Sequence, residues 1–568
     1  MRKIPTDPPA ACSSFGDLSF LSGGWPMWQQ NFTPIAGSLA YSTIIAAAPI
    51  FVLLLMLGVL RMPAWISALC GLATGAVVAV AGYGMPLRNL FGAVTFGAAF
   101  GLFPIGWVVF TAMLMYYVIV ESGKFEIIKD SVGHLTEDRR LQAILIAFAF
   151  GAFIEGAAGF GTPIAIAAAM LAGLGFSPFS AAAMALIANT APVAFGSLGI
   201  PMITLAATTG LPLDHLSAAT AWILAPLSVI VPSYLLLVMC GWKGLKGVLP
   251  AAILCGLAFG VTEFFILNTV GVQVTNIISS LTCILALVIL FRVWKPSDSF
   301  VLDARHGSHR FIAPPRHSAS ELLIAWSPYL LLVVIILLWG VRPVAAWLNA
   351  RNVLVNWPAL HNEVLRVPPI VTKPSPYGAS YTFSWLSASG TACLLATILS
   401  AAVLRMSPRV FWKVFVHTCK RLLPAETTLA CVLGLAYLMN YSGSTGTLGL
   451  AFAATGSLFP FFSGCLGWIG VFLTGSDTSS NALFGNLQEI TANRLHLDPV
   501  LMAAANSSGG VMGKMISLGS IAVAAAATSM KREDESNLFR FTIGHSIVLL
   551  LAVCLLVMLY VHIQPHFY

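Results

Sequence analysis

Charged residues are scarce in this sequence. Asp, Glu, Lys and Arg make up 9% of the 568 residues, whereas about a quarter of the residues of a soluble globular domain are charged. The apolar share is 58%. Many apolar runs, such as 42–60 and 546–561, approach or exceed the roughly 18 residues that cross the hydrocarbon core of a bilayer. The composition excludes a soluble domain and predicts an all-α polytopic membrane protein.

Several motifs are also missing. The ten cysteines contain no CxxC pair, which argues against a metal site and against a disulfide framework. No Walker A pattern is present, which argues against ATP-driven transport by this chain. There is neither a selectivity-filter repeat nor an Arg-rich voltage sensor. Residues 1–26 lack the apolar segment of a cleavable signal peptide. These absences favour a secondary transporter that uses an ion gradient.

The formal net charge of +8 does not indicate a nucleic-acid partner, because the basic residues fall in short loops between apolar runs. Loops rich in Lys and Arg remain on the cytoplasmic side of a membrane. We therefore place five loops inside: 124–140, 243–246, 292–316, 405–421 and 531–540. The loop 347–382 is poor in Lys and Arg for its length, and we place it outside together with the N-terminus.

With these loops fixed, the sequence predicts about twelve membrane crossings. They are 38–60, 63–84, 89–122 (interrupted at Pro104), 181–207, 218–241, 247–267, 275–294, 322–346, 384–404, 424–440, 499–527 and 541–563. Two further segments must begin and end on the same side, 141–176 inside and 448–492 outside. We predict that both are helical hairpins and that they enter the membrane from opposite sides.

The two hairpins occupy equivalent places in two halves of opposite orientation. "GAFIEGAAGFGTPIAI" (151–166) aligns with "GVFLTGSDTSSNALFG" (470–485), and "ANTAPVAFGSLGI" (188–200) aligns with "ANSSGGVMGKMIS" (505–517). Inverted repeats of this kind are typical of secondary transporters. The predicted organisation is an outer tail (1–37), a first repeat (38–241), linking helices with a basic cytoplasmic loop (242–321), a second repeat (322–563) and a C-terminal tail (564–568).

Three charged residues lie deep inside predicted membrane segments: Glu155, Asp477 and Lys514. A charge at the centre of a membrane helix costs about 2.5–3.5 kcal/mol on insertion scales, so such residues indicate function. Glu155 and Asp477 fall at the tips of the two hairpins. Three other acidic residues, Glu121, Glu263 and Glu426, fall nearer the ends of predicted spans, and we expect structural roles for them near the membrane interfaces.

Helix-breaking residues surround these charges, and broken helices expose backbone groups only where they line a cavity. The hairpin residues expected to do so are Gly156, Gly159, Gly161, Pro163 and Gly475. Hydroxyl and amide side chains near them are candidates for binding a substrate, together with Lys514: Thr162, Asn189, Thr190, Thr474, Ser476, Thr478, Ser479, Ser480, Asn481, Asn506, Ser507 and Ser508. We predict that the two clusters form one site near the midplane.

The types of residue at the predicted site indicate which class of substrate is transported. A fixed lysine suits a small anion, hydroxyls and amides suit hydroxyl groups on that anion, and Glu155 or Asp477 can accept a proton. The residues alone leave open a proton-coupled and a sodium-coupled carrier of a small organic anion. Simpler readings are close helix packing for "GAAGFG" and a Lys514 that reaches the inner surface. A membrane-bound enzyme or sensor is disfavoured, because the loops 295–320 and 347–382 are too short for a catalytic domain.

Several motifs closely resemble the bacterial L-lactate permease family: "GAFIEGAAGFGTPIAI", "NTAPVAFGSLGIP", "FLTGSDTSSNALF", "GGVMGKMIS", "WQQNF" (28–32) and "ESNLFRFTIGHS" (535–546). The resemblance runs from about Met27 to the C-terminus. It implies a symporter of the cytoplasmic membrane that takes up L-lactate with a proton, with D-lactate and glycolate as further substrates and no cofactor or metal. It also implies an architecture of inverted repeats and hairpins with elevator-like motion, commonly in a homodimer.

Three positions depart from the family pattern. Met27 aligns with the first residue of the family, so we expect that translation can start there rather than at Met1. Thr162 stands where the family often has Ala and adds a hydroxyl beside the first hairpin. Leu518 and Gly519 stand where the family often has Pro-Gln. The last two departures lie in site motifs and bear on substrate preference.

Overall fold

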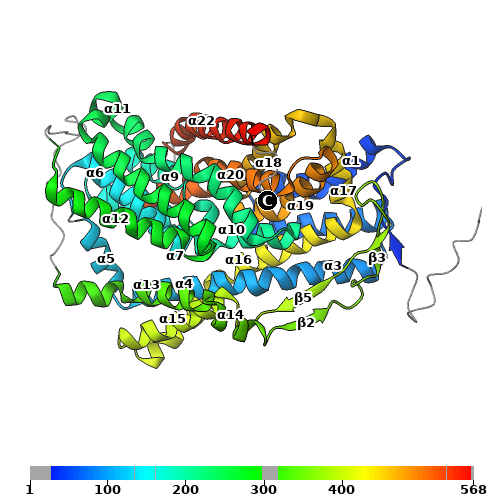
Figure 1. The fold of residues 1–568 in the computed structure, drawn as a ribbon, viewed down its shortest axis with the longest axis horizontal. Helices are drawn as coiled ribbons and strands as arrows, with labels where there is room; N and C mark the ends of the chain where they lie inside the picture. The colour runs from blue at the N-terminus through cyan, green and yellow to red at the C-terminus, as the bar shows by residue number, and fades with distance from the viewer. Residues whose placement is uncertain (1–26, 134, 160, 297–316, 532–533, 564–568) are drawn as a thin grey trace, which may run out of the picture.

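The computed structural model of the chain describes residues 27–133, 135–159, 161–296, 317–531 and 534–563. In this part, ten helices are long and apolar enough to cross a membrane, or up to twelve if each of two bent helix pairs is one span. This result confirms a polytopic helical fold. Helices pack together along the length of the molecule (Figure 1). Residues 1–26 of the predicted N-terminal tail, the predicted C-terminal tail 564–568 and residues 297–316 of the basic loop lie outside the described residues.

Up to Gly340, the described residues form thirteen helices and five shorter turns of π- or 3₁₀-helix. They are α1 Leu39–Gly58, α2 Ala64–Val77, η1 Val78–Gly82, α3 Leu87–Phe100, η2 Gly101–Gly106, α4 Trp107–Glu121, α5 Lys124–Gly133, α6 Arg139–Gln142, η3 Ala143–Phe150, α7 Gly151–Ala157, α8 Thr162–Gly173, α9 Pro178–Ala188, η4 Val193–Phe195, α10 Gly196–Thr209, α11 Leu213–Thr269, η5 Val272–Val274, α12 Thr275–Val293 and α13 Ala319–Gly340.

The second half continues with nine helices and two 3₁₀ turns, and five short strands accompany them. The helical elements are α14 Arg342–Asn349, α15 Ser389–Val403, α16 Pro408–Ser442, α17 Ser444–Phe452, η6 Ala453–Leu458, α18 Phe459–Thr474, α19 Asp477–Leu495, α20 Pro499–Gly513, η7 Lys514–Ile516, α21 Leu518–Ala527 and α22 Asp534–Ile563. The strands are β1 Trp28–Gln29, β2 Val353–Asn356, β3 Val364–Arg366, β4 Ser375–Pro376 and β5 Ser380–Phe383.

The strands are a departure from the all-α expectation. β3 pairs in parallel with β1 and antiparallel with β4, while β2 and β5 form an antiparallel pair (Figure 1). All of them belong to the N-terminal segment or to the loop 347–382. The β1–β3 pair therefore brings together two segments for which the sequence predicts the same, outer side of the membrane.

Several helices are interrupted where the sequence supplies a reason. Proline lacks a backbone N–H and disrupts the helical ladder. Accordingly, the helix from Leu87 to Glu121 passes through the π-helical turn η2 around Pro104, where an interruption is predicted. Within α11, Gly241 and Val248 have non-helical backbone angles. Gly256 packs against Val229 in the other half of α11, so the two crossings predicted there fold back on each other.

Two of the predicted crossings are bent helix pairs. The segment predicted as 181–207 is bent by 65° between α9 and η4–α10, and the segment 499–527 is bent by 44° between η7 and α21. Pro192 lies in the first break, and Ser517 caps α21 at the second. Apolar length suggested continuous helices there, but proline and a capping serine open the backbone.

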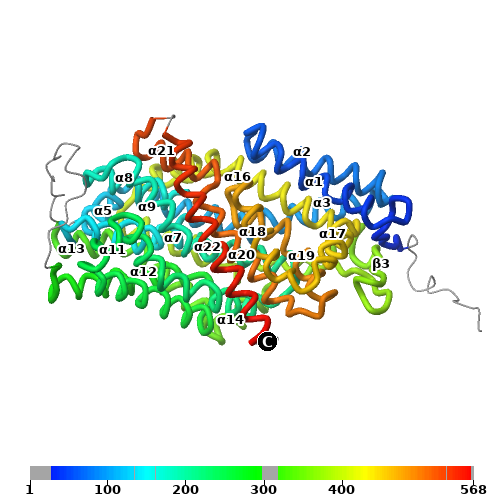
Figure 2. Tube along the Cα trace, turned by 90° about the horizontal axis from the view of Figure 1, so that it is seen from above, coloured from blue at the N-terminus to red at the C-terminus, as the bar shows by residue number. Residues whose placement is uncertain are grey.

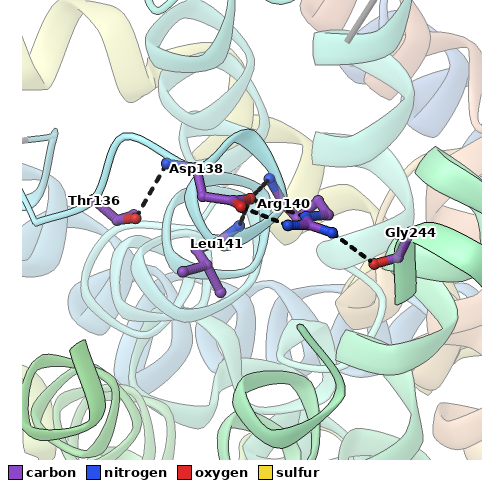
Figure 3. Close-up of polar contacts among 5 residues, drawn as sticks. All are labelled: Thr136, Asp138, Arg140, Leu141 and Gly244. Atoms are coloured by element: carbon purple, nitrogen blue, oxygen red, sulfur yellow. Dashed lines mark hydrogen bonds and ion pairs between the residues drawn. The ribbon is translucent and has the colours of Figure 1, made fainter. Parts of the chain in front are cut away.

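The first hairpin is shielded by the rest of the protein. Every residue from Arg140 to Ala157, in its first arm, is buried, whereas most residues of α1 are not. Asp138 caps α6 by accepting from the Arg140 N–H at 2.8 Å, and it pairs with the fully buried Arg140 guanidinium at 2.7 Å. Arg140 also donates to the Gly244 carbonyl at 3.1 Å (Figure 3). This contact ties the base of the hairpin to the turn within α11.

The second hairpin consists of α18 and α19, which reverse direction at Gly475, a residue with φ of 71°. α20 packs against both arms, and α22 crosses the outside of α18 and α20 (Figure 2). α10 contacts α7 of the first hairpin and α19 of the second. The broken helix α10 thus connects the two hairpins.

Candidate functional site

Four broken elements meet at one cavity of about 270 Å³. They are the turn between α7 and α8, the turn between α18 and α19, the start of α10 and the junction of α20 with α21. Eight of the predicted site residues line it: Glu155, Gly161, Thr474, Gly475, Ser476, Asp477, Thr478 and Lys514. The two clusters, far apart in the sequence, therefore face one common space of a size suited to a small molecule.

Asp477 begins α19 and is held by side chains from two helices. Ser507 Oγ of α20 donates to Asp477 Oδ2 at 2.6 Å, and Asn481 Nδ2 donates to the same oxygen at 3.2 Å. Asn481 also donates to the Pro201 carbonyl of α10 at 3.1 Å and accepts from Asn506 Nδ2 at 2.9 Å. Asp477 Oδ1 is buried without a hydrogen-bond partner. The protein therefore fixes Oδ2 through hydrogen bonds, whereas Oδ1 accepts none.

Glu155 lies in the last turn of α7 and is 5% exposed. Its Oε2 is buried without a hydrogen-bond partner. Gly196 of α10 lies directly against Oε1, since a Cβ at Gly196 would come within 2.4 Å of that atom. Asn189 approaches Glu155, but its side-chain oxygen and nitrogen make no hydrogen bond of normal geometry. Glu155 therefore has fewer fixed partners than Asp477.

Lys514 lies at the end of α20 and donates from Nζ to the Gly475 carbonyl. Gly475 caps the C-terminus of α18, where a cation is stabilised by the helix dipole and by free carbonyl groups. Lys514 interacts electrostatically with both Glu155 and Asp477. Among the described residues it makes no ion pair within 4.0 Å. Its charge is thus placed between two carboxylates without being neutralised by direct contact.

The start of α10 is strained. Ser197, Leu198 and Gly199 all have left-handed backbone angles, with φ of 46°, 59° and 82°. A non-glycine residue in this region costs roughly 1–2 kcal/mol, and such strain concentrates at functional sites. Ser197 Oγ donates to the Ala158 carbonyl at the end of α7 at 2.9 Å. This bond holds the strained turn against the tip of the first hairpin.

Other predicted residues support the wall rather than line it. Asn481, Asn506 and Ser507 form the network behind Asp477. Ser479 donates its N–H to the Ser476 side chain at 3.2 Å, which caps α19. Ser480 donates to the Gly467 carbonyl of α18 at 3.1 Å.

Six further predicted residues lie away from the cavity lining. Thr190 donates to the Ile187 carbonyl of its own segment, and Ser508 Oγ is buried without a partner. Thr162 and Pro163 begin α8, where proline is favoured in the first turn. Gly156 packs closely on Asn276 of α12, since a Cβ would lie 2.7 Å from the Asn276 Cβ. Gly159 adopts φ of 62° in the turn between the two hairpin arms.

Sequence reasoning missed part of the lining. The cavity also includes Gly196, Ser197, Pro201 and Ser520, together with Gly519, which the sequence singles out only as a departure from the family pattern. The signal was present in "FGSLGIP" (195–201), where glycine, serine and proline alternate with apolar residues. It was overlooked because the segment is apolar enough for a continuous span.

Three acidic residues lie outside the lining of this cavity, and two of them are enclosed by neighbouring helices. Glu263 is fully buried in α11, and neither of its carboxyl oxygens has a hydrogen-bond partner. Glu426 lies in the middle of α16 directly against Gly106, with Oε1 buried and without a partner. Glu121 is exposed at the end of α4.

Comparison with known proteins agrees with this architecture. The L-lactate permease family profile matches residues 42–564. The chain belongs to the L-lactate permease family. An L-lactate permease of Bacillus subtilis is 42% identical over 561 residues, which cover 94% of this chain and 99% of that protein. The glycolate permease GlcA of Escherichia coli is 42% identical over 537 residues, covering 92% and 96% of the two chains.

Among solved structures, the YdaH transporter of Alcanivorax borkumensis has a TM-score of 0.46 and 15% identity, over 84% of this chain and 89% of that one. The family assignment rests on the sequence matches rather than on this weaker likeness. Membership of a permease family, together with ten to twelve candidate membrane helices, identifies a multi-pass protein of the bacterial inner membrane.

Proposed function

We propose that this chain takes up L-lactate, and also D-lactate and glycolate, together with protons. The family match and the glycolate permease relative support the substrate class. The observation that carries the mechanism is the set of three charges around one small cavity: Glu155, Asp477 and Lys514. The lysine is the group that pairs with the carboxylate of the substrate.

Charge balance gives the reason for coupling. With all three groups ionised, the site holds two negative charges and one positive charge. A lactate anion adds a further negative charge, whereas a proton on one carboxyl restores the original balance. At an effective dielectric constant of about 20, two unit charges about 6 Å apart interact by about 3 kcal/mol, about a hundredfold in affinity. Binding the proton therefore favours binding the anion.

Glu155 is our choice for the proton carrier. Asp477 Oδ2 accepts two hydrogen bonds, from Ser507 and Asn481, and hydrogen bonds of this kind stabilise a carboxylate. Glu155 Oε2 has no such donor. The 2-hydroxyl of the substrate then meets the polar turn Thr474–Thr478. Proton and monoanion together carry no net charge, which lowers the electrostatic cost of moving the loaded site through the membrane.

We also propose that the two hairpins move as one body with α10 and α20 in an elevator-like cycle, within inverted repeats. The support is that both hairpin tips line the same cavity and that α10 contacts α7 and α19. No cofactor takes part beyond the proton, and a homodimer is the assembly we propose.

The test is uptake of radiolabelled L-lactate into proteoliposomes under an imposed pH gradient. The wild type should accumulate lactate with the interior alkaline, and an imposed membrane potential alone should not drive uptake. Glu155→Gln should lose accumulation yet retain lactate counterflow, because only proton coupling is removed. Glu137→Gln, in an exposed loop, is the matched control. Accumulation driven by a sodium gradient at equal pH would instead support the sodium-coupled carrier.

A further inference from the structure

A second polar cavity of about 250 Å³ lies at the opposite end of α19 from the candidate site. Asp477 starts this helix and Glu489 lines the second cavity, so at 1.5 Å per residue the two lie about 18 Å apart along the axis. The second cavity is bounded by the N-terminal segment, the loop 347–382, the end of α16 and α19. The sequence predicts the outer side of the membrane for all of these.

Arg366 is the cation of this second cavity. Its guanidinium carbon lies 4.7 Å from the centroid of the Tyr377 ring, and its Nε is buried without a hydrogen-bond partner. A guanidinium presents several donors in one plane and matches a carboxylate with two parallel hydrogen bonds. Arg366 is therefore suited to bind an anion, because its guanidinium is stacked on Tyr377 and its Nε donor has no hydrogen-bond acceptor in the protein.

Glu489 lines the same cavity and accepts from Asn493 Nδ2. In the described part of the chain, it forms no ion pair within 4.0 Å with Arg366. The Arg366 guanidinium and the Glu489 carboxylate thus line the same small cavity without forming an ion pair with each other across it. A ligand that carries a carboxylate and a hydroxyl satisfies both, because the carboxylate accepts from Arg366 and the hydroxyl donates to Glu489.

Hydrogen bonds within the protein hold the polar side chains on one wall of this cavity in place before any ligand binds. Asn440 Oδ1 accepts from Asn486 Nδ2 at 2.8 Å and from Thr445 Oγ1 at 2.8 Å. Gln30 Nε2 donates to the Asn440 carbonyl at 2.9 Å. These bonds join the N-terminal segment, α16, α17 and α19, so little further ordering is needed on binding.

We propose that this cavity is a second, outer binding site for 2-hydroxy carboxylates, which holds the substrate before it reaches the cavity at the hairpin tips. The proposal rests on the proposed function, because it assigns the same class of substrate to a second place. Its residues are Arg366 for the carboxylate, Glu489 for the hydroxyl and Tyr377 for positioning the guanidinium.

The first test is binding of radiolabelled L-lactate to the full-length protein in nanodiscs. Lys514→Met disables the deep site and should leave one saturable site, which the double variant Lys514→Met/Arg366→Gln should lose. In proteoliposomes, Arg366→Gln alone should raise the half-saturating lactate concentration about tenfold while the maximal rate is retained. Arg366→Lys, which keeps the charge, should fall between these values. Size-exclusion profiles equal to that of the wild type establish that the variants fold.

Arg494→Gln is the matched control. Arg494 is exposed on α19 and lines a neighbouring cavity but not this one, so the same change of charge should leave half-saturation unchanged. Equal effects of the Arg366 and Arg494 variants would show a long-range charge effect and overturn the outer site. Loss of all lactate binding in Lys514→Met would also overturn it.

A separate experiment tests the substrate class of the outer site. Glu489→Gln should reduce the preference for L-lactate over propionate, which lacks the hydroxyl, and an unchanged preference would overturn the role of Glu489. A wild-type protein that neither binds nor carries lactate or glycolate would contradict the proposed function itself. Normal lactate uptake with unchanged half-saturation in Arg366→Gln would overturn the outer site alone.

Discussion

Ser507 Oγ donates to Asp477 Oδ2 at 2.6 Å, joining the middle of α20 to the first residue of α19. Both side chains are buried. The next residue, Ser508, is also buried, but its hydroxyl has no partner. Of these two adjacent serines, Ser507 supports the carboxylate and also accepts from Asn481 Nδ2 at 3.2 Å, whereas Ser508 does neither.

Ser507→Ala is expected to lower the free energy of unfolding by about 1–3 kcal/mol, because a buried acceptor loses its donor. Ser508→Ala is expected to leave stability unchanged or slightly higher, because it removes a hydroxyl that is already unpaired. Thermal unfolding of the two purified variants in the same detergent measures the difference. Equal losses in both variants would contradict the role given to the Ser507–Asp477 bond.

Lys514→Met is expected to abolish lactate uptake while the protein remains folded. The substrate anion would then face two carboxylates without a cation, which is unfavourable by roughly 3 kcal/mol or more at the distances of this cavity. Lys514→Arg should retain part of the uptake. Lys531→Met, in an exposed position after α21, removes an equal charge and should have no effect. Full uptake by Lys514→Met would show that the lysine only caps α18.

The sequence predicted the membrane class, most helix positions and the charged residues of the cavity. Glu155, Asp477 and Lys514 stood out because a charge in an apolar run is costly, and they do line one cavity. Hydropathy did not reveal the left-handed turn Ser197–Gly199, because backbone angles depend on the contact with Ala158. Nor did it reveal that Glu263 is fully buried, since burial within a bundle depends on which helices surround it.

Gly509→Ala is expected to destabilise the protein by about 1–3 kcal/mol through overpacking. A Cβ at Gly509 would lie 2.1 Å from the Gly464 carbonyl oxygen of α18, and a backbone atom cannot rotate away. Gly544→Ala in α22 is the control, because no heavy atom lies within 4 Å of its Cβ position. Unfolding temperatures in detergent compare the two. A stable Gly509→Ala variant would show that α18 and α20 pack less closely than described.

Tyr377 should remain uncharged throughout the working range of the protein. Burial raises the pKa of its phenol from 10.0 to about 12. The associated stability is therefore complete below about pH 10 and is lost as the pH rises through about 12. Tyr377→Phe, which keeps the ring under Arg366, should leave the pH profile of uptake unchanged between about pH 5 and pH 9.

Tyr377→Leu is the contrasting variant, because it removes the ring itself. It should raise the half-saturating lactate concentration, since Arg366 loses the surface on which it stacks. If Tyr377→Phe instead altered the pH profile in that range, the phenol would have to titrate there, although partial burial raises its pKa.

Glu263→Gln is expected to preserve the fold and to leave the free energy of unfolding equal or higher. The Glu263 carboxyl is fully buried in α11 without a hydrogen-bond partner, and ionising such a carboxyl costs several kcal/mol. A neutral amide of the same shape removes that cost. Glu121→Gln, at an exposed helix end, controls for the change of charge. Because Glu263 does not line the cavity at the hairpin tips, proton-driven uptake should persist; a stable Glu263→Gln variant that no longer accumulates lactate would place Glu263 in the proton path.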